Sequence, residues 1–138
     1  MTHIDAQFTQ WCQQMGIPAQ FVVDPGNATV RSAVIAHMGL NGLTIVLDRD
    51  QFVQFVATVG RVPSTSPAPL FRQMLAQNSG SAYGQYCILE AISMIRFQHV
   101  MRIPDLSFPT FQTVLNGFCG NVLGLAMPLK MQFQIPNA

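Results

Sequence analysis

The sequence predicts an α+β fold of order α-β-β-β-α-β-β-α, in which an antiparallel five-stranded twisted sheet is flanked by three helices. Apolar residues recur with helical spacing near both ends of the chain and once in its middle. Between these stretches lie five short apolar segments separated by turn residues, a pattern typical of antiparallel strands. The 138 residues suggest one domain, residues 1–138.

The first helix is predicted from one apolar face and a clear stop. The apolar residues fall at spacings of three and four, and Gly16 and Pro18 end the pattern. The face consists of Ile4, Phe8, Trp11, Cys12 and Met15.

A meander of three strands is expected next. The turn signal at 24–27 precedes strands at 28–37, 43–48 and 52–60, with a turn at 39–42 between the first two. The proline-rich residues 62–69 then end the meander.

A short amphipathic helix and a hairpin follow. Pro67 suits the first turn of a helix that carries Leu70, Phe71, Met74 and Leu75 on one side. Strands are expected at 84–92 and 94–103, joined by a tight turn near Ile92 and Ser93. Both faces of this hairpin are apolar, so one face needs a cover beyond the domain's own helices, and a second subunit is the simplest candidate.

The last helix is expected from Ser107 to about Leu125. Its glycines, Gly117, Gly120 and Gly124, leave one side nearly bare, which favours close packing on the sheet over a dimer seam. Its apolar side consists of Phe111, Val114, Leu115, Phe118 and Val122.

Composition excludes several function classes. Charged residues make up only 9% of the chain, the net charge is +1, and the arginines are scattered, so no nucleic-acid partner is expected. The uncharged run from Leu106 to Leu129 contains glycines and polar residues, and its apolar positions repeat with helical period instead of filling the helix all round, so membrane insertion is not expected either. The three cysteines have spacings that match no zinc-binding or CxxC pattern, and no signal peptide is visible. Both observations favour a cytoplasmic protein with reduced thiols.

No motif for catalysis, a metal or a cofactor is present, so the chain is not expected to be an enzyme. The three histidines lack metal-ligand spacing, and no phosphate-binding loop occurs. Cys87 and His99 are candidate neighbours across the hairpin, but a core thiol is the better interpretation. Glu90 is expected to pair with Arg96 or Arg102.

Three segments of the chain resemble class I type III secretion chaperones, the Tir-chaperone (CesT-like) family. Residues 52–63 resemble the third strand of that family, and residues 70–90 resemble its second helix and fourth strand. Residues 101–122 resemble its fifth strand and third helix. The resemblance implies a bacterial cytoplasmic homodimer linked to virulence. Such a protein binds an extended N-terminal segment of a secreted effector protein and keeps it secretion-competent without ATP.

Candidate site residues follow from this resemblance. Val53 and Phe55 share one strand face, opposite Phe52 and Val56, and one set is expected to face the core while the other serves a ligand. The effector-binding candidates are Phe8, Trp11, Met15, Val53 and Phe55. The dimer-interface candidates are Leu70, Phe71, Met74, Tyr86 and Ile88.

Two alternatives stay open. The first is a small-molecule-binding or enzymatic α+β domain whose pocket lies between helix and sheet, with Cys87, His99 and Glu90 converging on one concave spot. The second is a purely structural subunit of an oligomeric complex.

Overall fold

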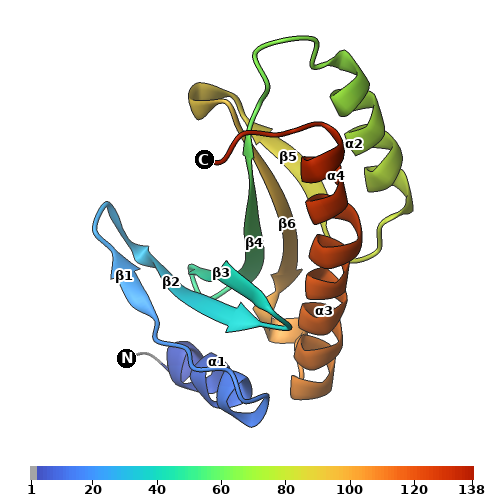
Figure 1. The fold of residues 1–138 in the computed structure, drawn as a ribbon. Coiled ribbons are helices and arrows are strands. Elements are labelled where there is room, and N and C mark those ends of the chain that lie inside the picture. The colour runs from blue at the N-terminus through green and yellow to red at the C-terminus, as the bar shows by residue number, and fades with distance from the viewer. Residues whose placement is uncertain (1–2) are drawn as a thin grey trace.

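The computed structural model describes residues 3–138 and has the mixed α+β fold with an antiparallel sheet (Figure 1). The sheet has six strands in the order β1-β2-β3-β4-β6-β5 rather than the expected five. The strands are β1 Val22–Asp24, β2 Asn27–His37, β3 Leu40–Asp48, β4 Phe52–Arg61, β5 Gln85–Leu89 and β6 Met94–Arg102. The helices are α1 His3–Gln14, α2 Ala68–Gly80, α3 Phe108–Asn121 and α4 Met127–Gln132.

Strands β2, β3 and β4 form the expected meander. The turn between β2 and β3 comes earlier than expected, because Met38 and Gly39 both adopt positive φ and make a two-residue turn. Strand β3 therefore begins at Leu40, and Leu43 pairs with Ile35 on the inner face.

The β5–β6 hairpin is shorter than expected. Strand β5 ends at Leu89, a 3-10 turn covers Glu90–Ile92, and Ser93 adopts the left-handed conformation before β6 begins. Glu90 is thus an exposed turn residue. Within residues 3–138 no ion pair joins it to an arginine, and Arg102 lies 3.8 Å from Asp105 instead, so the expected Glu90 pairing is wrong.

Helices α1 and α3 cover one face of the sheet, which we call the inner face (Figure 1). A chain of aromatic rings joins the layers: Phe111 of α3 lies 5.5 Å from Phe8 of α1 and 5.8 Å from Phe55 of β4. Phe118 stacks on Phe97 of β6 at 5.5 Å. The buried side of α3 is the predicted one, since Phe111, Val114, Leu115, Phe118 and Val122 are all buried.

The last helix extends past its expected end near Leu125. A π turn, Val122–Ala126, connects α3 to α4, which starts one residue before Pro128. Proline lacks an N–H and crowds the carbonyl one turn earlier, and a π turn is one way for a helix to continue past it. After α4 the chain passes the end of β4, where the N–H of Arg61 donates to the Pro136 carbonyl at 2.9 Å.

The opposite face of the sheet, the outer face, has no helix packed against it in the described part of the chain (Figure 1). Cross-strand neighbours on this face include Val34, Thr44, Val56 and Gln98. Val34 is 69% exposed and Val100 45% exposed, whereas Val56 is buried among its neighbours. None of the helices within residues 3–138 has the length and apolar character needed to cross a membrane.

Candidate peptide-binding groove

A groove of about 650 Å³ lies between α1 and the β1–β2 hairpin. We call it the α1–β1 groove. Its apolar lining comes from Ala19, Phe21, Val23 and Ala28, and its polar lining from Asp5, Arg31, Arg49 and Asp50. Val23 and Arg31 lie directly opposite each other on β1 and β2. A second hollow of about 460 Å³ shares Thr9 and Ala19 with it, so the surface continues along α1 to Gln13 and Pro18.

The end of α1 shapes the groove near Ala19. Gly16 has φ 73°, and the N–H of Ile17 donates to the Cys12 carbonyl at 2.8 Å, which is the Schellman arrangement for a helix end. Ile17 is then buried and anchors the chain to the core. Residues 18–21 return along α1 without regular structure and lead into β1.

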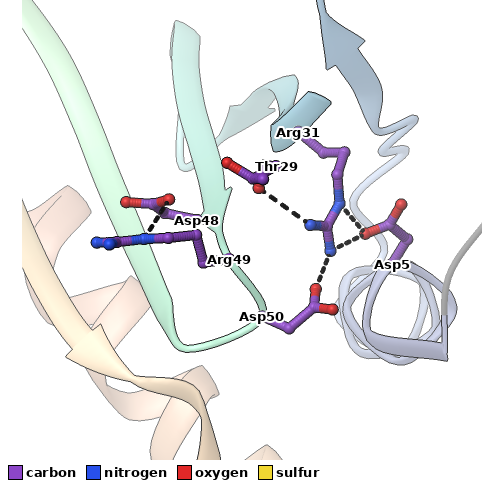
Figure 2. Close-up of polar contacts among 6 residues, drawn as sticks. All are labelled: Asp5, Thr29, Arg31, Asp48, Arg49 and Asp50. Atoms are coloured by element: carbon purple, nitrogen blue, oxygen red, sulfur yellow. Dashed lines mark hydrogen bonds and ion pairs between the residues drawn. The ribbon is translucent and has the colours of Figure 1, made fainter. Parts of the chain in front are cut away.

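The polar lining of the groove is built around a buried arginine (Figure 2). Arg31 of β2 donates from Nε to Asp5 Oδ1 at 2.8 Å and from Nη1 to the Thr29 carbonyl at 3.3 Å, and its Nη2 also contacts Asp50. Burial lowers the pKa of Arg31, but the hydrogen bonds and charges of Asp5 and Asp50 raise it by more, so the guanidinium stays charged.

This network joins three elements at one point. Asp5 lies in the first turn of α1, where a carboxylate also suits the helix dipole, and Asp50 lies in the β3–β4 turn. The side chains of Arg31 and Asp5 are 6% and 7% exposed, whereas that of Asp50 is 50% exposed. The network therefore ties α1 and the β3–β4 turn to β2, and Asp50 is its accessible carboxylate.

The two edges of the sheet differ in their availability. At the β5 edge, the Asn78 side chain of α2 accepts from the Tyr86 N–H at 2.7 Å and donates to the Tyr86 carbonyl at 3.2 Å. These bonds occupy the groups that a further strand would use. At the other edge β1 pairs only with β2 within residues 3–138, and Val22 and Val23 are 60% and 52% exposed. The open edge thus borders the α1–β1 groove.

Four of the five expected effector-binding residues lie in the core. Phe8, Val53 and Phe55 are at most 1% exposed and Trp11 is 9% exposed. The reason is that the inner face of β4 and the apolar face of α1 both pack on α3, so they are not available to a ligand. The fifth, Met15, is partly buried against the core at the end of α1. On the opposite face of β4, Phe52 is half-buried and Val56 is buried.

Three of the expected dimer residues are also in the core of this chain. Leu70, Met74 and Tyr86 are buried because α2 packs against β5 on the inner side of the sheet. Phe71 and Ile88 are partly buried against the same core. Their neighbours Leu75 and Ile92, which are 68% and 60% exposed, are the apolar residues that this region presents to solvent.

Most of the apolar groove residues that the sequence interpretation missed come from one short segment. Phe21, Val22 and Val23 precede the turn at 24–27, and β2 follows it, so residues 21–30 have the apolar–turn–apolar signature of a hairpin. That signal was present in the sequence, but a strand of three residues is too short to show alternation.

The residues of the small-molecule alternative do not converge. Cys87 and His99 both line a hollow of about 310 Å³, but Cys87 pairs with Arg96 on the outer face, while His99 pairs with Phe55 on the inner face. Burial raises the pKa of Cys87 more than Arg96 lowers it, and burial lowers the pKa of His99. A protonated thiol and a neutral imidazole on opposite faces do not form a nucleophile–base pair.

The other titratable groups give no sign of a metal centre or an activated thiol. Burial raises the pKa of Cys12 and of Cys119 to about 11, so both thiols are protonated at neutral pH. Across residues 3–138, no three side chains from His, Cys, Asp and Glu lie close enough to hold a metal ion.

Comparison with known proteins rests on structure alone. No protein-family model and no curated protein matches the sequence. Among solved structures, the fold matches a chain of the HopA1–SchA chaperone–effector complex with a TM-score of 0.64. The match covers 90% of this chain and 93% of that one at 12% sequence identity. The resemblance to secretion chaperones is therefore confirmed at the level of the fold.

Proposed function

We propose that this protein is a bacterial cytoplasmic chaperone of type III secretion, which binds an extended N-terminal segment of a secreted effector as a dimer and without ATP. The observation that carries the proposal is the α1–β1 groove beside the open edge of β1. The likeness of fold to a chain of a chaperone–effector complex supports the same role.

The geometry suggests how such a segment is held. An extended chain that pairs with β1 places alternate side chains on alternate faces, so every second side chain points toward the side on which Val23 lines the groove. Because β1 has only three residues, backbone hydrogen bonds contribute little, and apolar burial against Ala19, Phe21 and Val23 supplies most of the affinity. The rigid Arg31 network lowers the ordering cost on the chaperone side.

The test uses two neighbouring valines as a matched pair. Both are exposed residues of β1, but Val23 lines the groove and Val22 faces away from it. N-terminal fragments of secreted proteins from the same genome are titrated into the protein by calorimetry, and the true partner is expected to bind with a negative heat-capacity change. Val23→Asp should weaken that binding by at least tenfold, whereas Val22→Asp should leave it within about twofold.

Two results would count against the proposal. One is equal loss of affinity in both valine variants, which would place the segment elsewhere. The other is the absence of any binding fragment together with tight binding of a small metabolite that Cys87→Ala or His99→Ala displaces. The second result would favour the small-molecule domain in place of the chaperone.

A further inference from the structure

A hollow of about 300 Å³ lies on the inner side of the sheet, where strands β3 and β4 separate. We call it the β3–β4 wedge. The register of the two strands ends at the pair Thr44–Val56, and no strand within residues 3–138 pairs with the facing edges of residues 40–43 and 57–59. These two stretches form one side of the wedge. The other side comes from the π turn and α4, through Val122, Ala126, Met127 and Lys130.

Three irregularities of the backbone line this wedge. In β3 the register shifts by one residue beside Gly42, whose φ of 76° places a bend where the strand leaves β4. In β4, Val59 is an extra residue relative to the neighbouring strand β6. The π turn that carries the last helix past Pro128 lies on the opposite side. Bulges and π turns are both enriched at functional sites, and here they leave room for a ligand between the helix and the sheet.

The lining of the wedge combines three kinds of groups. Much of it is apolar and buried, with Leu43, Ala57 and Val122 at 4%, 7% and 5% exposed. The open strand edges supply backbone N–H and C=O groups. Among the described residues that line the wedge, Lys130 alone is charged, and no ion pair joins it to a carboxylate within residues 3–138. Its Nζ donates to the Asn137 side chain at 2.6 Å, which leaves two of its three donors for a ligand.

We propose that the wedge binds a small molecule that joins an apolar group, an amide and a carboxylate, as an N-acylated apolar amino acid does. The apolar group is buried against Leu43, Ala57 and Val122, the amide bonds to the open strand edges, and the carboxylate binds Lys130. A volume of about 300 Å³ is at the lower end of the range for small-molecule pockets and suits a ligand of this size. The wedge shares no lining residue with the α1–β1 groove, so this site does not depend on the proposed function.

The test compares N-acetyl-leucine with N-acetyl-leucinamide, which differ only in the charge of one end. Each compound is titrated at neutral pH into the ¹⁵N-labelled protein and followed by the chemical shifts of the backbone amides. N-acetyl-leucine is expected to bind about tenfold more tightly, because its carboxylate gains a charge-assisted contact with Lys130. The largest shifts should fall on Gly42, Thr58 and Ala126, which all line the wedge.

Two variants with the same loss of charge locate the carboxylate. Lys130→Gln should remove the preference for N-acetyl-leucine and leave the protein folded, because Lys130 is only partly buried and a glutamine amide is also a donor. Arg72→Gln is the matched control. Arg72 is exposed on α2 and does not line the wedge, so this variant should keep the tenfold preference.

Three outcomes would overturn the inference. The first is equal affinity for the two compounds, or no shift with either of them at millimolar concentration. The second is a preference for N-acetyl-leucine that survives Lys130→Gln. The third is a set of shifts outside the wedge, because the carboxylate would then bind elsewhere. Each of these would leave the proposed function intact if effector fragments still bind the α1–β1 groove. N-acetyl-leucine bound at the wedge, with no effector fragment bound at the groove, would instead remove the proposed function alone.

Discussion

At the scale of single residues, Arg31 and Asp5 stand out because they are the buried charged residues of the described chain. A buried ion pair adds little net stability, but loss of Asp5 would remove the buried counter-charge of Arg31 and leave the half-exposed Asp50 beside it. Asp5→Ala should therefore lower the free energy of unfolding by about 3–5 kcal/mol, measured by urea denaturation.

The double variant separates charge from packing. Asp5→Leu together with Arg31→Met replaces the pair by apolar groups of similar size and should recover most of the loss. Asp48→Ala, which removes the exposed partner of Arg49, should cost less than about 1 kcal/mol and serves as the control. A double variant as unstable as Asp5→Ala would contradict this account.

The raised pKa values of the buried thiols of Cys12 and Cys119 lead us to expect a loss of stability at alkaline pH. The unfolded thiols release their protons near pH 9.0, but burial raises the folded pKa of each to about 11. Because the folded state then binds more protons than the unfolded state, stability is full below pH 9 and falls as pH rises toward 11. The slope is at most about 1.4 kcal/mol per pH unit for each thiol.

Urea denaturation at pH 8 and pH 10 measures this slope. Cys12→Ala and Cys119→Ala should each flatten it, whatever they cost at pH 8. Cys87→Ala is the control, because Cys87 is only partly buried and Arg96 opposes the effect of burial on its pKa. An unchanged slope in the Cys12→Ala/Cys119→Ala variant would show that other groups cause the alkaline loss.

At the scale of elements, sequence patterns were sufficient where an element is long and has one buried face. The apolar residues of α1 and α3 and the strands of the meander show this, because a repeat of 3.6 or 2 residues is visible over nine residues or more in each of them. The pattern failed at β1, which has three residues, and at the β5–β6 turn, where Ser93 adopts a positive φ that no local residue signals.

The glycines of α3 give a prediction about this helix. A Cβ at Gly117 would lie 2.3 Å from the ring of Tyr83, whereas a Cβ at Gly120, three residues further, would meet nothing within 4 Å. Gly120→Ala should raise the free energy of unfolding by about 0.5–1 kcal/mol through helix propensity.

Gly117→Ala gains the same propensity but must displace Tyr83, whose ring also lies beside His99. We expect it to lower stability by about 1–3 kcal/mol, as overpacking does. Thermal or urea denaturation of the two variants side by side gives the comparison. Equal stabilisation by both substitutions would mean that the 81–84 loop yields without cost.

At the scale of the whole molecule, the sequence indicated the fold class but not which apolar face is free. Alternation along β4 shows that Phe55 and Val56 point to opposite sides, but it does not show which side α3 covers. That choice depends on contacts between segments far apart in the chain, such as Phe8 with Phe111. The effector-binding and dimer candidates were therefore largely core residues, and part of the groove's lining came from residues 19–23, which the sequence patterns assigned to no element.

The last prediction concerns assembly. Helix α2 buries Leu70 and Met74 in its own chain, while Phe71 is half-buried and Leu75 is 68% exposed. Phe71 and Leu75 are four residues apart, so they form a stripe on the outward side of α2. We expect this stripe to be the centre of a two-fold dimer interface of about 1,200–2,000 Å² in total.

Sedimentation equilibrium at micromolar concentration should give twice the chain mass of 15.2 kDa. Leu75→Asp should shift the mass to that of a single chain, because an unpaired carboxylate in a dry seam costs several kcal/mol. Val34→Asp is the matched control: Val34 is 69% exposed on β2, which lies far from α2 (Figure 1), and its substitution should leave the dimer intact. A single-chain mass for the unmodified protein, or equal dissociation by both substitutions, would remove the α2 stripe as the interface. The open edge of β1 lies at the far end of the sheet from α2. A dimer formed through α2 would therefore leave both α1–β1 grooves free for effector segments.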